Sequence, residues 1–93
     1  MIAVLTHHWV KKGKMLEASQ LLEANGLAQS KATGFILRHT LYSKNDQNKI
    51  TSLVIWINES MYNDWKASPE RKCTMAGAYE LWANPPKSER FLE

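Results

Sequence analysis

The side chains of this 93-residue chain that are best suited to chemistry are its three histidines and its many aromatic residues. His7 and His8 are neighbours in an apolar segment, and an imidazole titrates close to working pH, which suits proton transfer. Adjacent strand residues point to opposite faces, so these two histidines cannot ligate one metal ion together. His39 has no matching cluster of Cys, Asp or Glu, and the single Cys73 has no local His or acidic partner. The residue types therefore favour proton transfer and predict no metal site.

The composition is that of one small globular domain covering residues 1–93. Apolar residues make up 44% of the chain, which argues against disorder, and the net charge of +3 is too small for a phosphate-driven nucleic-acid binder. One cysteine allows no internal disulfide, which fits a reducing compartment. No cleavable leader pattern follows Met1, and no apolar run approaches the length of a membrane span. We therefore expect a cytoplasmic protein that binds neither membranes nor nucleic acid.

The elements that must position these side chains follow from periodicity and turn residues. Alternating β-branched and aromatic segments predict strands, and spacings of three and four predict helices. We expect strands over Ile2–Val10, Phe35–Ser43, Ile50–Ile57 and Ala78–Ala83, one helix from Lys14 that is capped or kinked at Gly26, and a second from Asn58 that restarts at Ser68. Pro85-Pro86 should end the last strand, leaving the tail to form one more turn. The order β-α-β-β-α-β predicts an α+β, ferredoxin-like fold with a four-stranded antiparallel sheet.

Both faces of this sheet are predicted to be apolar. In the third strand Val54 and Trp56 point one way while Leu53, Ile55 and Ile57 point the other. The helices can cover only one face, so the other needs a second cover. The simplest cover is another copy of the chain, and we expect a homodimer with its two sheets packed face to face.

The segment "TSLVIWINESMYNDWKAS", residues Thr51 to Ser68, places a tryptophan at a strand end and a second one helix later. Together with the turn at Gly13 and with Gly34-Phe35 opening the second strand, this resembles the antibiotic biosynthesis monooxygenase family. The resemblance implies a dimeric α+β barrel built from a single domain, and an enzyme of the monooxygenase type.

In that family the ligand cavity lies between the sheet and the helices of each subunit. Counting back from Gly13, the side chains of Thr6 and His8 would face the helices as polar groups on an apolar surface. Each then needs a partner, because an unpaired buried polar group costs about 1–3 kcal/mol. A slip of one residue would substitute His7 for His8.

The resemblance favours chemistry without a cofactor. The haem-degrading relatives place a haem-ligating histidine beyond the second tryptophan, whereas the corresponding segment Arg71–Gly77 contains none. In relatives that oxidise quinols or anthrones, an electron-rich small aromatic substrate is deprotonated and meets O₂ in a dry slot. Here His8 would be the base, Tyr62 and Trp65 the aromatic wall, and Thr6 or Asn63 a donor to the oxyanion.

Other functions fit the same fold. An isomerase of a small hydroxyketone or lactone would use the same histidine as a proton shuttle, and a stress-associated binding protein would need the cavity without a base. RNA-binding domains of this topology carry a glycine-aromatic run in their third strand, which "ITSLVIWI" (Ile50–Ile57) lacks. Oxygen consumption separates the monooxygenase from the isomerase.

Overall fold

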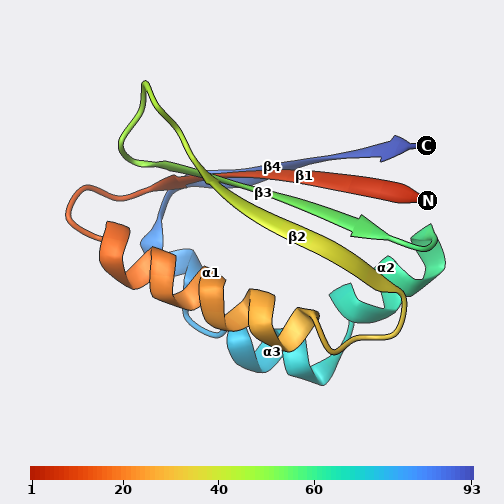
Figure 1. Ribbon diagram of the computed structural model, residues 1–93. Helices are drawn as coiled ribbons and strands as arrows, with labels where there is room; N and C mark the ends of the chain where they lie inside the picture. Colours follow the sequence, from red (N-terminus) through yellow and green to blue (C-terminus); the bar gives the residue numbers. More distant parts are fainter.

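The computed structural model describes all of residues 1–93. Its elements are β1 (Ile2–Val10), α1 (Met15–Gln29), β2 (Phe35–Tyr42), β3 (Lys49–Trp56), α2 (Glu59–Lys66), α3 (Pro69–Thr74), a short 3₁₀ helix (Ala78–Leu81) and β4 (Trp82–Leu92). The four strands form one antiparallel sheet in the order β2-β3-β1-β4. All the helices lie on one side of this sheet (Figure 1). The predicted α+β, ferredoxin-like fold is therefore confirmed, with an open rather than a closed sheet.

Both helix starts predicted from capping residues are present. The Asn58 side chain accepts a hydrogen bond of 2.9 Å from the backbone N–H of Met61, at the start of α2. The Ser68 hydroxyl accepts one of 3.2 Å from Arg71, and Pro69 occupies the first turn of α3. These caps satisfy backbone donors that the first turn of a helix leaves free. The two caps fix where helices α2 and α3 begin after strand β3.

The prediction for the last strand was wrong. Residues Ala78–Leu81 form a 3₁₀ helix, and the strand begins at Trp82, passes through Pro85-Pro86 and continues to Leu92. The tail is therefore strand, not an extra turn. Proline has no backbone N–H to donate, so it is tolerated on edge strands and at bulges, where no hydrogen bond to a neighbouring strand is lost. Strand β4 pairs only with β1, and the register between them shifts at the two prolines.

Gly26 neither ends nor caps helix α1, which continues to Gln29. A Cβ at this position would lie 2.8 Å from both Cδ and Nε of Arg38 on β2. Such a contact is closer than real Cβ atoms approach other atoms, so a side chain here would force Arg38 to move. This glycine in the last turn of the helix thus marks a close approach of a side chain from the sheet.

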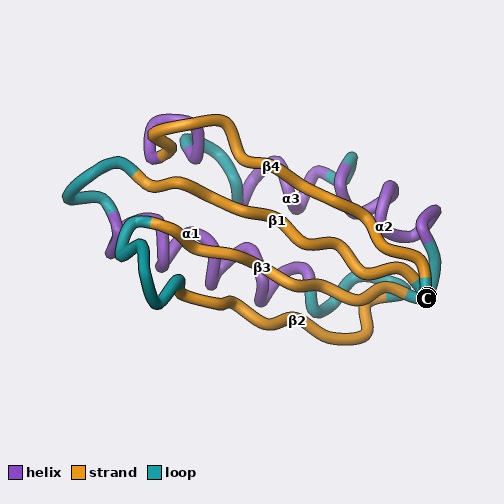
Figure 2. Tube along the Cα trace, turned by 90° about the horizontal axis from the view of Figure 1, so that it is seen from above, coloured by secondary structure: helices purple, strands orange, loops and turns teal.

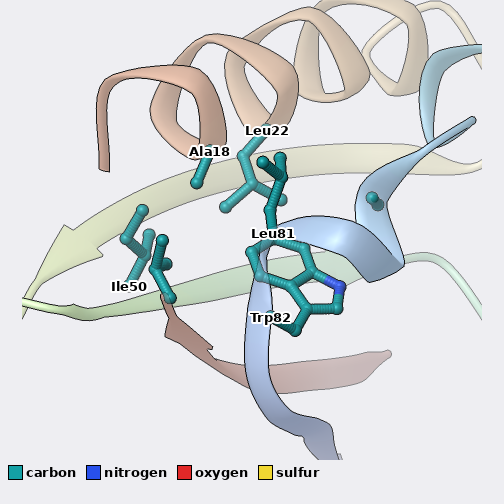
Figure 3. Packing of buried hydrophobic residues seen from close by; sticks show 7 residues of the cluster. Ala18, Leu22, Ile50, Leu81 and Trp82 are labelled. Atoms are coloured by element: carbon teal, nitrogen blue, oxygen red, sulfur yellow. The ribbon is translucent and has the colours of Figure 1, made fainter. Parts of the chain in front are cut away.

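The hydrophobic core consists of two separate clusters. The first holds Val10, Ala18, Leu22, Ile50, Ala78, Leu81 and Trp82. Ala18 and Leu22 point from α1 toward Ile50, with Leu81 and Trp82 beside them (Figure 3). The second holds Ile2, Val4, Val54, Trp56, Tyr62 and Trp65. Polar side chains lie along the strands between the two, so the core is divided rather than continuous.

The other face of the sheet carries no helix (Figure 2). The strand register places Leu5 opposite Leu53 on this face, and Ile55 between Ala3 and Leu37. The centre of this surface is apolar, as the sequence predicts, and it is bordered by His39 on β2 and Glu89 on β4. None of the helices is long and apolar enough to cross a membrane.

Candidate functional site

A small cavity of about 90 Å³, here called the inner chamber, lies between the sheet and the helices. Thr6 and His8 from β1 and Tyr62 and Trp65 from α2 contribute to its lining. A second cavity of about 420 Å³, the outer chamber, shares Thr6 and His8 with it and extends to Trp82. The structure therefore brings together four of the six side chains that the sequence nominates.

His7 lies on the opposite face of the sheet. Its Nδ1 is 2.8 Å from Oγ1 of Thr51, its neighbour on β3, and it lines neither chamber. Asn63 is also outside, exposed to solvent, and its amide oxygen accepts a hydrogen bond of 3.1 Å from Arg90. The register of β1 therefore directs His8 and not His7 toward the helices.

His8 is almost fully buried, with only 5% of its surface exposed. Its ring centroid lies 4.8 Å from that of Trp82, and its Nδ1 has no hydrogen-bond partner. Burial is the largest cause that lowers the pKa of His8 to about 4, and the positive charges of Arg38 and Arg71 add to it. The imidazole is therefore neutral at pH 7, the form that can accept a proton. With its pKa lowered in this way, the imidazole is a weak base.

The free energy of unfolding is expected to fall when the pH is lowered from about 6.5 to about 4, because the pKa of His8 drops to about 4 on folding. In this interval the unfolded chain binds a proton that the folded chain does not, so stability rises with pH. A shift from 6.5 to about 4 corresponds to about 3 kcal/mol. Urea titrations of the protein and of His8→Gln at about pH 7 and about pH 4 should show a smaller loss in the variant. Equal losses would contradict the assignment to His8.

Tyr62 and Trp65 belong to the second core cluster as well as to the wall of the inner chamber. Tyr62 packs against Trp56 with ring centroids 6.0 Å apart. The guanidinium of Arg90 covers its outer side, 4.8 Å from the ring centroid, and is itself held by Glu59 at 2.6 Å. Tyr62 is thus packed on one side by Trp56 and on the other by Arg90.

Several polar residues of the inner chamber were not found from the sequence. Asn25 and Gln29 extend the buried face of α1 that begins at Ala18, but they are polar and so interrupt the apolar pattern. Arg38 reaches the chamber from β2 and donates from Nη1 to Oε1 of Gln29 at 2.9 Å. The glycine at position 26 was the one sequence signal for this contact, because an isolated glycine in a helical pattern usually has a packing reason.

No group of three or more His, Cys, Asp or Glu side chains lies close enough together to hold a metal ion. The donors around the chamber are instead an imidazole, amides, hydroxyls and cationic side chains. This set of side chains suits the binding of an organic ligand and the transfer of a proton to or from it.

Comparison with known proteins supports the same fold. The family model for antibiotic biosynthesis monooxygenases matches residues 1–77. No curated protein matches the chain in sequence. Among solved structures, a Nitrosomonas europaea protein assigned to antibiotic biosynthesis monooxygenases superposes with a TM-score of 0.92 at 14% identity, covering 100% of this chain and 98% of that one.

Two further structures are similar. A conserved protein from Methanosarcina mazei Go1 has a TM-score of 0.92 at 18% identity, with coverage of 99% and 91%. SnoaB, a cofactor-independent oxygenase from Streptomyces nogalater, has a TM-score of 0.88 at 13% identity, again with coverage of 99% and 91%. At such identities these likenesses establish the fold alone, and the match to the family model establishes the family. The chain belongs to the antibiotic biosynthesis monooxygenase family.

Proposed function

We propose that the protein is a cofactor-independent monooxygenase that oxidises a small quinol- or anthrone-like substrate in the cavity between sheet and helices. The observation that carries this proposal is a buried, neutral imidazole at His8, which lines both chambers. Family membership supports oxygenase chemistry, and the structural neighbour SnoaB is a cofactor-independent oxygenase.

The reaction needs little from the protein because an electron-rich substrate supplies its own electrons. For a methylene carbon flanked by aromatic rings, R₂CH₂ and O₂ give R₂C=O and H₂O. One oxygen atom forms the new carbonyl, and the other leaves as water with the two hydrogens of the methylene. The protein has to remove the first proton, which we assign to His8, and keep the resulting carbanion away from bulk water. Trp65 and Tyr62, which line the inner chamber, would form the apolar wall on that side of the reacting carbon.

Oxygen uptake by the purified protein tests the proposal directly. Hydroquinones, anthrones and enediols would be supplied without added metal or flavin, with boiled protein as the control. Uptake that depends on intact protein, with label from ¹⁸O₂ in the product, is the expected result. Turnover of an enediol or hydroxyketone without oxygen consumption would instead support the isomerase. Binding without any turnover would support the stress-associated binding protein.

We also propose that the protein is a homodimer through the uncovered face of the sheet. Leu53 lies in the middle of this face, on a central strand, between Leu5 on β1 and His39 on β2, and Ile55 follows it on the same face. An apolar sheet face without cover is unfavourable in water, and a second copy would bury it.

Light scattering at micromolar concentration is expected to give the mass of two chains. Leu53→Glu should shift the mass toward one chain, because burying an unpaired carboxylate at the interface costs several kcal/mol. Leu16→Glu, a matched change on the outer side of α1 where 72% of the leucine is exposed, should leave the dimer intact. A wild-type monomer at this concentration would exclude the proposed interface.

A further inference from the structure

We propose that the inner chamber is a carboxylate subsite, in which Arg38 binds the acid group of an anionic aromatic substrate whose ring lies in the outer chamber. This inference rests on the proposed function and narrows the class of substrate to a quinol or anthrone that carries a carboxylate.

The charge of the lining is one-sided. Arg38, Lys66 and Arg71 line the inner chamber, the outer chamber adds Lys72, and neither is lined by an Asp or Glu. The chain has nine acidic residues, so the absence of Asp and Glu from the walls of both chambers does not follow from the composition. The ion pairs of the structure are Lys14–Glu17 and Arg90–Glu59, and so none of the lining cations has a carboxylate partner. A cavity of this kind favours an anion.

Arg38 is the lining cation that most needs a partner. Its Nη1 donates to Gln29, and its Nε lies 3.4 Å from the Thr40 hydroxyl, but its Nη2 is buried with no hydrogen-bond partner. Burial also lowers the pKa of Arg38. A buried charge is normally paired, and a guanidinium is matched in geometry by a carboxylate.

Two residues of α1, Gly26 and Gln29, determine the position of the Arg38 side chain. Gly26 provides the space for its side chain below α1, as the 2.8 Å approach to Cδ and Nε shows. One helical turn farther on, Gln29 orients the guanidinium. A glycine within a helix costs about 0.5–1 kcal/mol relative to alanine, and here it serves to admit the arginine.

The sizes of the two chambers indicate which part of the substrate each would hold, the acid group in the inner chamber and the ring in the outer chamber. The inner chamber of about 90 Å³ is smaller than the roughly 150 Å³ cavity that holds benzene, but it has room for about three waters, and hence for a carboxylate. The outer chamber of about 420 Å³ accepts a ring beside Tyr79 and Trp82. Since His8 lines both chambers, the atom next to the imidazole would lie between acid and ring.

A carboxylate at Arg38 also changes His8. Besides burial, the positive charges of Arg38, His7 and Arg71 lower the pKa of His8. An anion in the inner chamber offsets the charges of the two arginines and makes the imidazole a stronger base. The negative charge of the bound carboxylate would then couple substrate binding to proton abstraction by His8.

Binding measurements with three probes test the subsite without any turnover. Benzoate, benzyl alcohol and phenyl phosphate would be titrated against the intact protein by calorimetry. Benzoate is expected to bind about tenfold to a hundredfold more tightly than benzyl alcohol, as a charge-assisted hydrogen bond predicts. Arg38→Gln should abolish this preference, and Gly26→Ala should reduce it by displacing the guanidinium while leaving the fold intact. Lys12→Gln, which removes one charge from the turn after β1, should leave it unchanged.

Equal affinity of the wild-type protein for benzoate and benzyl alcohol would overturn the proposal without reference to any variant. Tighter binding of phenyl phosphate than of benzoate would overturn the carboxylate in favour of a phosphate. The subsite and the proposed function fail separately. Oxygen uptake without benzoate preference removes the subsite alone, and benzoate preference without oxygen uptake on any aromatic acid removes the monooxygenase alone.

Discussion

Replacing His8 by glutamine is expected to lower turnover in the oxygen-uptake assay by about 10²–10⁴-fold, the usual contribution of a general base. Glutamine keeps a polar side chain of similar length in the chamber wall, but it cannot accept a proton at neutral pH. The loss should appear in kcat, because the substrate still has the same cavity to occupy.

His7→Gln is the matched change one residue earlier. Since His7 lies on the other face of the sheet, 2.8 Å from the Thr51 hydroxyl, its replacement should leave kcat within about twofold. The pair thus tests the register of β1 and the chemistry together. Full activity in both variants would show that neither imidazole is the base, and a loss confined to His7→Gln would reverse the assignment.

Replacing Trp56 by alanine is expected to lower the free energy of unfolding by about 3–5 kcal/mol, the range for large aromatic side chains in a core. Trp56 is fully buried, and its ring contacts Phe35 edge-on at 5.8 Å and Tyr62 at 6.0 Å. Removing it leaves a void in the second core cluster and releases one wall of the inner chamber. Urea denaturation followed by circular dichroism measures the change without relying on tryptophan fluorescence.

Trp56→Phe separates packing from hydrogen bonding at the same position. The indole Nε1 is buried without a partner, so phenylalanine keeps a ring in place and removes an unsatisfied donor. We expect it to cost less than half as much as alanine. A phenylalanine variant as unstable as the alanine variant would show that the whole indole, and not just an aromatic ring, fills the site.

The parts of the fold that could be predicted from the sequence are those set by local pattern. The even-numbered residues of β1, including Thr6 and His8, face the helices because strand side chains alternate, and counting back from the turn at Gly13 indicated which set does so. The caps at Asn58 and Ser68 were predictable because each needs only a side-chain oxygen three residues before a free N–H.

The parts that could not be predicted depend on distant partners. The tail forms a strand because β1 offers it an edge, and nothing within "KSERFLE" (Lys87–Glu93) encodes that edge. Leu27 fits the helical apolar pattern yet is 66% exposed, whereas Gln29 is buried because Arg38 needs an acceptor. The carboxylate subsite was missed for the same reason, since its central contact joins α1 to β2.

The division of the core has a consequence for local opening. Each hydrophobic cluster holds one end of the sheet, and the polar chamber between them adds little cohesion in the absence of a ligand. The two ends can therefore lose protection against amide hydrogen exchange as separate cooperative units. An occupant that binds Arg38 and packs beside Trp82 would contact both, so it should slow exchange at both ends by the same factor and join them into one unit.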